Sequence, residues 1–293
     1  GEITGRTNLD EFGTLSSPIL ITNTLSVGEV HRATVDWQVR LHPEIGPSEW
    51  SAPVVAETYD GFLNDTAGQH VTREHVWQAL DSAASGPVSE GNTGGGTGML
   101  LFGFKGGTGT SSRTVEIDGR RYVVGVLVQG NFGAREHLLV DGVPVGREIT
   151  GPGLERGASG SMAAGDGSII VVIGTDIPFS DRQLARLCRR GMLGLSRVGS
   201  VAGNGSGDLL IAFSNHPDCR VPYPDQPAIL TTPRLSDEII SPVFQATVEA
   251  TEEAVINALI AADTMTGRDG NIAYALPHDQ LRDIMRRHNR LRG

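Results

Sequence analysis

Cysteine and aromatic residues are scarce in this chain of 293 residues, and long apolar runs are missing. The two cysteines, Cys188 and Cys219, lack the neighbour spacing of a metal site, and we interpret them as one buried and one surface thiol. No stretch approaches the roughly 18 consecutive apolar residues of a membrane span. There is no signal-peptide pattern, so we expect a cytoplasmic protein, although the chain begins at Gly1 without a methionine.

Positive charge is the minority charge of the chain. Lysine and arginine number 24 against 34 aspartate and glutamate residues, which gives a net charge of −10. Nucleic acids and anionic membranes reward clustered positive side chains, so we expect neither as a partner. The acidic balance is compatible with a substrate that carries a free amine. Hydrophobic residues make up 39% of the chain, which suffices for a substantial core.

Several motifs that carry chemistry in other enzymes are absent. The glycine clusters match neither GxxxxGK[ST] nor GxGxxG, since Lys105 is followed by Gly106 and no cluster has its third glycine in register. The run GASGS at 157–161 falls one residue short of GxSxG. The eight histidines are dispersed and form no HExxH pair. We therefore expect no metal and no organic cofactor.

Short apolar runs and helix caps are mixed throughout the chain, which predicts an α/β protein. Several of the runs are apolar throughout, as expected for strands that are covered on both faces. The predicted strands are Ile19–Thr22, Val54–Glu57, Met99–Phe104, Tyr122–Gln129, Ile169–Ile173 and Leu209–Phe213. Helices are predicted from a capping box at Ser26 to Leu41, from Thr72 to Ala84, from a capping box at Ser180 to Leu195, from Ser241 to Ala262, and after Pro277.

One junction has the chemistry of a nucleophile. The glycine-rich segment Gly151–Gly167 leads directly into Ser168, which begins an apolar run. Serine is a weak nucleophile and needs a base beside it. If the Gly167–Ser168 bond breaks, the new α-amino group supplies that base, because its reference pKa is about 7.7–8.0. The alternative is an ordinary glycine turn into a core strand, with Ser168 as the cap.

The run GSIIVVIGTD at 167–176 resembles the self-processing site of the DmpA-type aminopeptidases, peptidase family S58. That family includes L-aminopeptidase/D-Ala-esterase/amidases and β-peptidyl aminopeptidases. Other segments resemble the family in the same order along the chain: Thr22–Gly28, Gly61–Asp65, Gly94–Met99, Gly103–Ser112, Val126–Gly133, Gly199–Asp208 and Thr264–Gly270.

The resemblance implies a fold and a way of maturation. The fold would be a four-layer αββα sandwich of the self-processing N-terminal-nucleophile type. The chain would form one domain, cleaved into residues 1–167 and 168–293. An amino-terminal stretch of the family, of the type NAITDVxGVxVGH, has no counterpart in this sequence. We therefore expect an open sheet edge and an apolar groove near Ile19–Thr22 or Val54–Glu57.

The resemblance also implies roles for individual residues. Gly167 and Ser168 flank the cleavage site, and Ser168 is the nucleophile. Asn131 donates its amide to the oxyanion, or it is simply a turn residue. Ser206 and Asp208 match a Ser-x-acid pair in which the serine lies near the nucleophile and the acid orients the amine. For Asp208 an ordinary glycine turn into a strand is an equal alternative, since the β-peptidyl branch has a longer glutamate there.

Two further residues are assigned to the substrate. Glu57 matches an acidic residue that binds the substrate's amino group, and Tyr59 is a candidate for a second oxyanion donor. We thus predict a self-processing serine aminopeptidase that acts on small peptides, amides or esters with a free amino terminus. The alternatives are an acyltransferase of the ornithine acetyltransferase type and a non-catalytic binding protein. Tetramers are expected by resemblance, with contacts from Leu184–Val198 and Val243–Ile260, unless both helices simply cover the sheets.

Overall fold

The structure is a computed structural model, and it describes residues 1–157, 167–222 and 227–291. Its centre is a four-stranded sheet in the order β5-β6-β8-β9. These strands are β5 (Gly107–Ile117), β6 (Arg120–Asn131), β8 (Ser168–Thr175) and β9 (Gly207–Ser214). β5, β6 and β8 pair antiparallel, whereas β9 runs parallel to β8. Asp118 and Gly119 join β5 to β6 with positive φ angles of 50° and 72°, as a tight two-residue hairpin requires.

One face of this sheet is covered by two helices, α5 (Asp181–Arg197) and α6 (Ser241–Ile260). Alternate residues of β8, namely Ile169, Val171 and Ile173, are fully buried and belong to the main core together with side chains of both helices. Ile170, which points to the opposite face, is fully buried as well. The uniformly apolar sequence of β8 therefore reflects burial on both faces.

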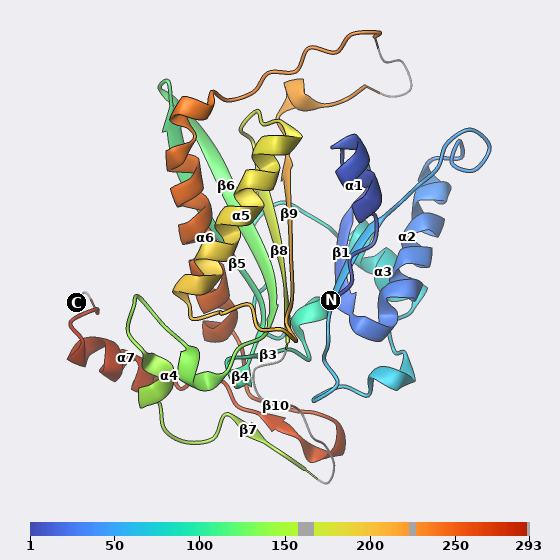
Figure 1. Cartoon of the computed structure of the whole chain (residues 1–293). Coiled ribbons are helices and arrows are strands. Elements are labelled where there is room, and N and C mark those ends of the chain that lie inside the picture. Colours follow the sequence, from blue (N-terminus) through green and yellow to red (C-terminus); the bar gives the residue numbers. More distant parts are fainter. Residues whose placement is uncertain (158–166, 223–226, 292–293) are drawn as a thin grey trace.

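The second sheet packs against that opposite face. It consists of β1 (Ile19–Asn23) and β2 (Val54–Thr58), which are parallel, and β2 contacts β8. Its outer face carries α2 (Val27–Leu41) and α3 (Arg73–Asp81), as Figure 1 shows. Helices, sheet, sheet and helices follow one another across the molecule, so the predicted αββα sandwich is confirmed.

The edge of β2 is closed by the first residues of the chain. Ile3 forms a bridge with Ala56, and the N–H of Thr4 donates to the carbonyl of Val55 at 2.9 Å. All five residues of β2 are buried, whereas the first three of β1 are half-buried. The expected open groove is thus absent along β2.

The remaining elements are short and lie mostly at one end of the sandwich, near the glycine clusters. They are α1 (Arg6–Phe12), β3 (Leu100–Leu101), β4 (Phe104–Lys105), α4 (Val145–Glu148), β7 (Leu154–Glu155), β10 (Met265–Thr266), β11 (Ile272–Ala273) and α7 (His278–Arg287). β7 pairs with β11, so the predicted linker begins with an ordered strand. The part of that linker at 158–166, including most of the GASGS run, lies outside the described residues.

Two local predictions were wrong, and a third is confirmed. The run Met99–Phe104 is a β3–β4 hairpin and not one strand, because Phe102 and Gly103 take positive φ and turn the chain back. Ser26 forms no side-chain cap, because a 3-10 turn (Thr24–Ser26) precedes α2 and places Ser26 in a helical conformation. The capping box at Ser180 is confirmed by the bond from the N–H of Gln183 to the Ser180 hydroxyl.

Candidate active site

Three strand ends meet at Ser168. Asn131 is the last residue of β6 and pairs with Ser168, the first residue of β8. On the other side Ser168 pairs with Gly207, the first residue of β9. Ser168 and Asn131 are 8% and 7% exposed, so both lie just beneath the surface. The sheet itself therefore brings the predicted nucleophile and the predicted oxyanion donor together.

The backbone before Ser168 has room only for glycine. A Cβ on Gly167 would lie 2.0 Å from the carbonyl oxygen of Asn131, so any side chain there would force the strands apart. The reason for glycine is this close approach, since no left-handed φ is found at Gly167. The carbonyl oxygen of Gly167 accepts a hydrogen bond of 2.9 Å from the N–H of Gly207. The predicted cleavage bond is thus held and polarised by β9.

The side-chain amide of Asn131 is fixed at both ends by backbone groups. Its Oδ1 accepts from the N–H of Leu100 at 2.8 Å, and its Nδ2 donates to the carbonyl of Tyr59 at 2.8 Å. A backbone N–H can only donate and a carbonyl can only accept, so these partners determine which end of the amide is which. One hydrogen of Nδ2 remains for another acceptor.

Tyr59 contributes its backbone to this arrangement. Its side chain is 49% exposed and folds over Gly61, where a Cβ would lie 2.1 Å from the phenol oxygen. The carbonyl of Tyr59 is the group that contacts Asn131.

Ser206 and Asp208 form a hydrogen-bonded pair at the start of β9. The hydroxyl of Ser206 donates to Oδ1 of Asp208 at 2.6 Å, and Oδ2 of Asp208 is buried without a partner among the described residues. Burial raises the pKa of Asp208, against the lowering effects of Ser206 and of the positive amino group of Gly1. Asp208 pairs with Ile169, so strand alternation places its side chain on the sheet face opposite the Ser168 hydroxyl. The backbone nitrogen of Ser168 lies in the plane of the sheet, between the face that carries the Asp208 side chain and the face that carries the Ser168 hydroxyl.

Glu57 comes from the second sheet and is 3% exposed. The Thr24 hydroxyl donates to its Oε2, and the backbone N–H of Glu2 donates to its Oε1 at 2.7 Å. The amino nitrogen of Gly1 lies 3.8 Å from the same Oε1. A Cβ on Gly207 would lie 2.3 Å from that amino nitrogen and 3.0 Å from Ser168 Oγ.

A second buried carboxyl lies close to Glu57. Oδ2 of Asp60 accepts from the side-chain amides of Asn23 at 3.1 Å and Asn64 at 2.9 Å. Burial raises the pKa of Asp60, and the charge of Glu57 adds to the increase. These residues fix the loop that follows β2.

Three contributors to this region were not predicted from the sequence. They are the Thr24 hydroxyl at Glu57, the Leu100 N–H at Asn131, and Lys105, whose side chain is fully buried beside Leu100. A backbone N–H donor cannot be predicted from the residue type, because every residue except proline has one. Lys105 could have been noticed in the sequence, because it is the single lysine of the chain.

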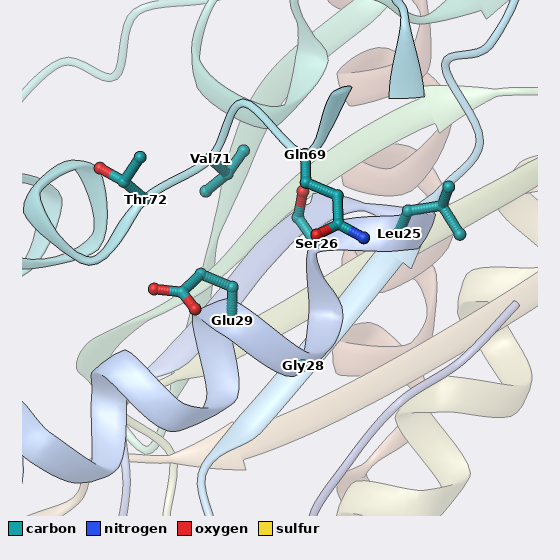
Figure 2. A pocket seen from close by; sticks show the side chains of 7 residues that line it. All are labelled: Leu25, Ser26, Gly28, Glu29, Gln69, Val71 and Thr72. Carbon is teal, nitrogen blue, oxygen red and sulfur yellow. The ribbon is translucent and has the colours of Figure 1, made fainter. Parts of the chain in front are cut away.

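A hollow of about 480 Å³ borders the site. It begins at Leu25, directly after Thr24, and lies between the start of α2 and the segment before α3. Figure 2 shows Glu29 on α2 across from Val71 and Thr72, with Ser26 near Gln69. Ser168, Asn131 and Glu57 do not line this hollow.

The comparison with known proteins decides the family. A family model described as peptidase family S58 matches residues 1–273. The chain belongs to peptidase family S58. Beta-peptidyl aminopeptidase BapA of Sphingosinicella microcystinivorans is 48% identical over 299 residues, which cover 99% of this chain and 74% of that protein. BapA of Sphingosinicella xenopeptidilytica is 46% identical over 295 residues, which cover 98% and 72%.

A solved structure of the S58 type agrees with the fold. The L-aminopeptidase D-Ala-esterase/amidase of Ochrobactrum anthropi matches with a TM-score of 0.91 and 44% identity, covering 100% of this chain and 79% of that one. That structure is described as a prototype for the serine aminopeptidases and as a new variant among the Ntn hydrolase fold. The αββα sandwich described above is therefore of this hydrolase type, and the S58 chain is a hydrolase.

Two further observations concern the described part of the chain. No helix there is long and apolar enough to cross a membrane. Within 1–157, 167–222 and 227–291, no three His, Cys, Asp or Glu side chains come together as a metal site.

Proposed function

We propose that this S58 protein is a self-processing serine aminopeptidase that cleaves its Gly167–Ser168 bond and then uses Ser168 to release amino-terminal residues. The observation that carries the proposal is the meeting of Ser168, Asn131 and Gly207 at three paired strand ends. Glu57 lies on β2, the strand of the second sheet that contacts β8. The family and the aminopeptidase names of its relatives support the proposal.

Self-cleavage begins with attack of Ser168 Oγ on the carbonyl carbon of Gly167. The negative charge that develops on the carbonyl oxygen is stabilised by the N–H of Gly207, which already donates to this atom. The C–N bond then breaks, the nitrogen of Ser168 takes up the hydroxyl proton, and an ester remains between Gly167 and Ser168. Water hydrolyses this ester, which leaves a carboxylate on Gly167 and a free amine on Ser168.

Substrate hydrolysis uses the new amine as the base. The Ser168 amine accepts the hydroxyl proton, Oγ attacks the substrate carbonyl, and the proton passes to the leaving amine. The remaining Nδ2 hydrogen of Asn131 stabilises the oxyanion of this step, and Tyr59 is a candidate for a second donor. Ser206 and Asp208, which are hydrogen-bonded to each other at the start of β9, are assigned to the orientation of the amine, so that its lone pair is directed at Oγ. Water then releases the acyl group.

Glu57 selects the substrate by its free amino terminus. A buried carboxylate favours an ammonium over a blocked terminus, because an acetylated amine leaves the charge without a partner. Peptides that begin with a β-amino residue are the first substrates to test, since the 48% and 46% identical relatives are named β-peptidyl aminopeptidases.

The substrate assay also separates the alternatives. Release of p-nitroaniline from β-alanyl p-nitroanilide without any acyl acceptor supports a hydrolase. A requirement for an amine acceptor would favour an acyltransferase. No turnover by an uncleaved chain would favour a binding protein. For assembly, we propose a homotetramer, although α5 and α6 bury their apolar faces against their own sheet.

A further inference from the structure

Lys105, the single lysine of the chain, is completely buried next to the active site. Lysine is among the residues that are almost never fully buried without a charged partner. Lys105 has no salt bridge within the described ranges of the chain, and its side chain instead reaches carbonyl groups. Such an isolated buried cation is costly, so its retention needs a reason.

The Lys105 ammonium is held by three backbone carbonyls. Its Nζ donates to Gly106 at 2.7 Å, to Met99 at 3.0 Å and to Gly96 at 3.2 Å. These acceptors use all three of its hydrogens. The ammonium therefore ties the glycine turn Gly94–Gly96 to both strands of the β3–β4 hairpin.

One of these carbonyls belongs to the peptide that holds Asn131. The oxygen of the Met99–Leu100 peptide accepts from Lys105, and the N–H of the same peptide donates to Oδ1 of Asn131. The N–H of Gly106 also donates to the Met99 carbonyl, at 2.9 Å. A charge at the carbonyl end of a peptide polarises the N–H at its other end, and hydrogen bonds in such a chain strengthen one another. The chain runs from the ammonium through the peptide and the Asn131 amide to the free Nδ2 hydrogen.

We propose that Lys105 is a positioning residue for the oxyanion site: its ammonium fixes and polarises the Met99–Leu100 peptide, which orients the Asn131 amide and strengthens its remaining N–H as a donor. This inference rests on the proposed function, since it assigns the oxyanion of the substrate step to Asn131. Lys105 itself touches neither substrate nor Ser168, so it acts only through Asn131.

The protonation of Lys105 matters for this role, and burial lowers the pKa of Lys105 to about 7. Three other ionisable residues contact the same turn. Asp60 lies against Gly98, Arg135 stacks over Phe104 at 4.6 Å, and the Tyr274 carbonyl accepts from the Lys105 N–H at 2.8 Å. Arginine stays protonated across the working range, an aspartate titrates on the acid side, and the pKa of the Tyr274 phenol is raised. Among these groups, we therefore assign a loss of activity at alkaline pH to the deprotonation of Lys105.

The first test replaces Lys105 by methionine, an unbranched side chain that is one atom shorter and carries no charge. Lys105→Met should lower kcat for β-alanyl p-nitroanilide about tenfold per titrated active site, with KM nearly unchanged, because the lost interaction serves the transition state. The alkaline fall of kcat should also disappear. Arg121→Met is the matched control, since it removes an exposed cation from the same strand as Asn131 and should change neither.

The second test needs no variant. Selective 13C,15N labelling gives one lysine side-chain signal, so NMR can follow the titration of Lys105 in the wild-type enzyme with and without 2-aminoethylboronic acid. The boronate adduct of Ser168 carries the negative charge of the oxyanion. Coupling between two binding events is reciprocal, so an ammonium that strengthens the bound oxyanion tenfold gives Lys105 a pKa that is higher by about one in the adduct.

The outcomes separate this inference from the proposed function. A wild-type enzyme that hydrolyses no free-amine substrate defeats the proposed function. If the wild-type enzyme is active, two results would contradict the Lys105 inference. One is a lysine signal that titrates identically with and without bound boronate, and the other is a kcat of Lys105→Met within about twofold of wild type. Should Lys105→Met fail to fold, the wild-type titration alone decides.

Discussion

Asn131 and Ser168 face each other in register as the last residue of β6 and the first residue of β8. Antiparallel pairing fixes the distance between two such positions more firmly than any loop could. The consequence is that the proposed oxyanion donor and the proposed nucleophile share the rigidity of the central sheet. Gly167, one residue earlier, passes so close to the Asn131 carbonyl that a side chain is excluded.

Replacing Asn131 by alanine tests the oxyanion assignment. Asn131→Ala should lower kcat about 10²- to 10³-fold, the usual effect of losing one oxyanion donor. It should also lower the free energy of unfolding by about 1–3 kcal/mol, because the Leu100 N–H and the Tyr59 carbonyl lose a buried partner. Asn257→Ala removes a similar side-chain bond to the Thr110 carbonyl elsewhere in the sheet and serves as control. A kcat for Asn131→Ala equal to that of the control would refute the assignment.

Replacing Glu57 by glutamine tests the amine anchor. A hydrogen bond to a charged group contributes about 1.5–3 kcal/mol, so Glu57→Gln should raise KM for free-amine substrates about 10- to 150-fold. Acetylated substrates should be hydrolysed slowly by both the wild-type enzyme and Glu57→Gln. Glu116→Gln, on the exposed face of β5, should behave as wild type. Equal rates on free and acetylated substrates would show that Glu57 does not select the amine.

The buried carboxyl of Asp208 predicts a particular pH dependence. Because its folded pKa is raised above 3.8, the native state binds a proton that the unfolded chain has already lost in the interval between the two values. Stability therefore falls as pH rises through that interval, and ionised Asp208 costs stability at neutral pH. The proposed role of the carboxylate in orienting the amine predicts the opposite sign for activity, which should be lost as pH falls through the folded pKa.

Asp208→Asn should accordingly separate the two effects. The variant should be at least as stable as wild type at pH 7 in urea unfolding, and its kcat/KM should be lower by about a hundredfold. The acid limb assigned to Asp208 should vanish from its pH profile. If the variant is as active as wild type and has the same pH profile, Asp208 is only part of an ordinary turn into β9, which is the alternative given by the sequence.

Assembly is the prediction that the fold supports least directly. The family resemblance implies a tetramer, and Leu193 on α5 is 54% exposed, yet most apolar residues of α6 are buried within the chain. Light scattering at micromolar concentration should give about 124 kDa for a tetramer of 31.0 kDa chains. A value near one chain mass would contradict the prediction.

The layers of the fold could be predicted from the sequence because their signals are local. The run at β8 and the capping box at Ser180 fix a buried strand and a helix start, and both are found. β5 was not predicted, because its sequence GTGTSSRTVEI has few apolar residues. Its strand conformation results from pairing with β6 and from packing against α6. Phe102 broke the predicted strand at 99–104 because a bulky residue took a left-handed φ that propensity does not foresee.

The candidate site was predictable only where residue type carries the chemistry. Ser168, Asn131 and Glu57 were proposed from motifs. Ser168 and Asn131 pair with each other, and the Ser206–Asp208 pair lies at the start of the next strand. The groups that hold them in place could not be predicted in this way. The Leu100 N–H, the Tyr59 carbonyl and the Gly207 N–H are backbone groups, and their positions follow from the hairpin and the sheet register alone.

The central claim is self-cleavage before Ser168, and intact-mass measurement of the purified protein tests it most directly. We predict two fragments of about 18 and about 13 kDa, in proportion to 167 and 126 residues of a 31.0 kDa chain, with Ser168 as the second amino terminus. Ser168→Ala should remain whole, and Ser196→Ala, at the exposed end of α5, should be cleaved like wild type. A wild-type protein of one undivided mass, or a Ser168→Ala protein cut at the same bond, would contradict the account.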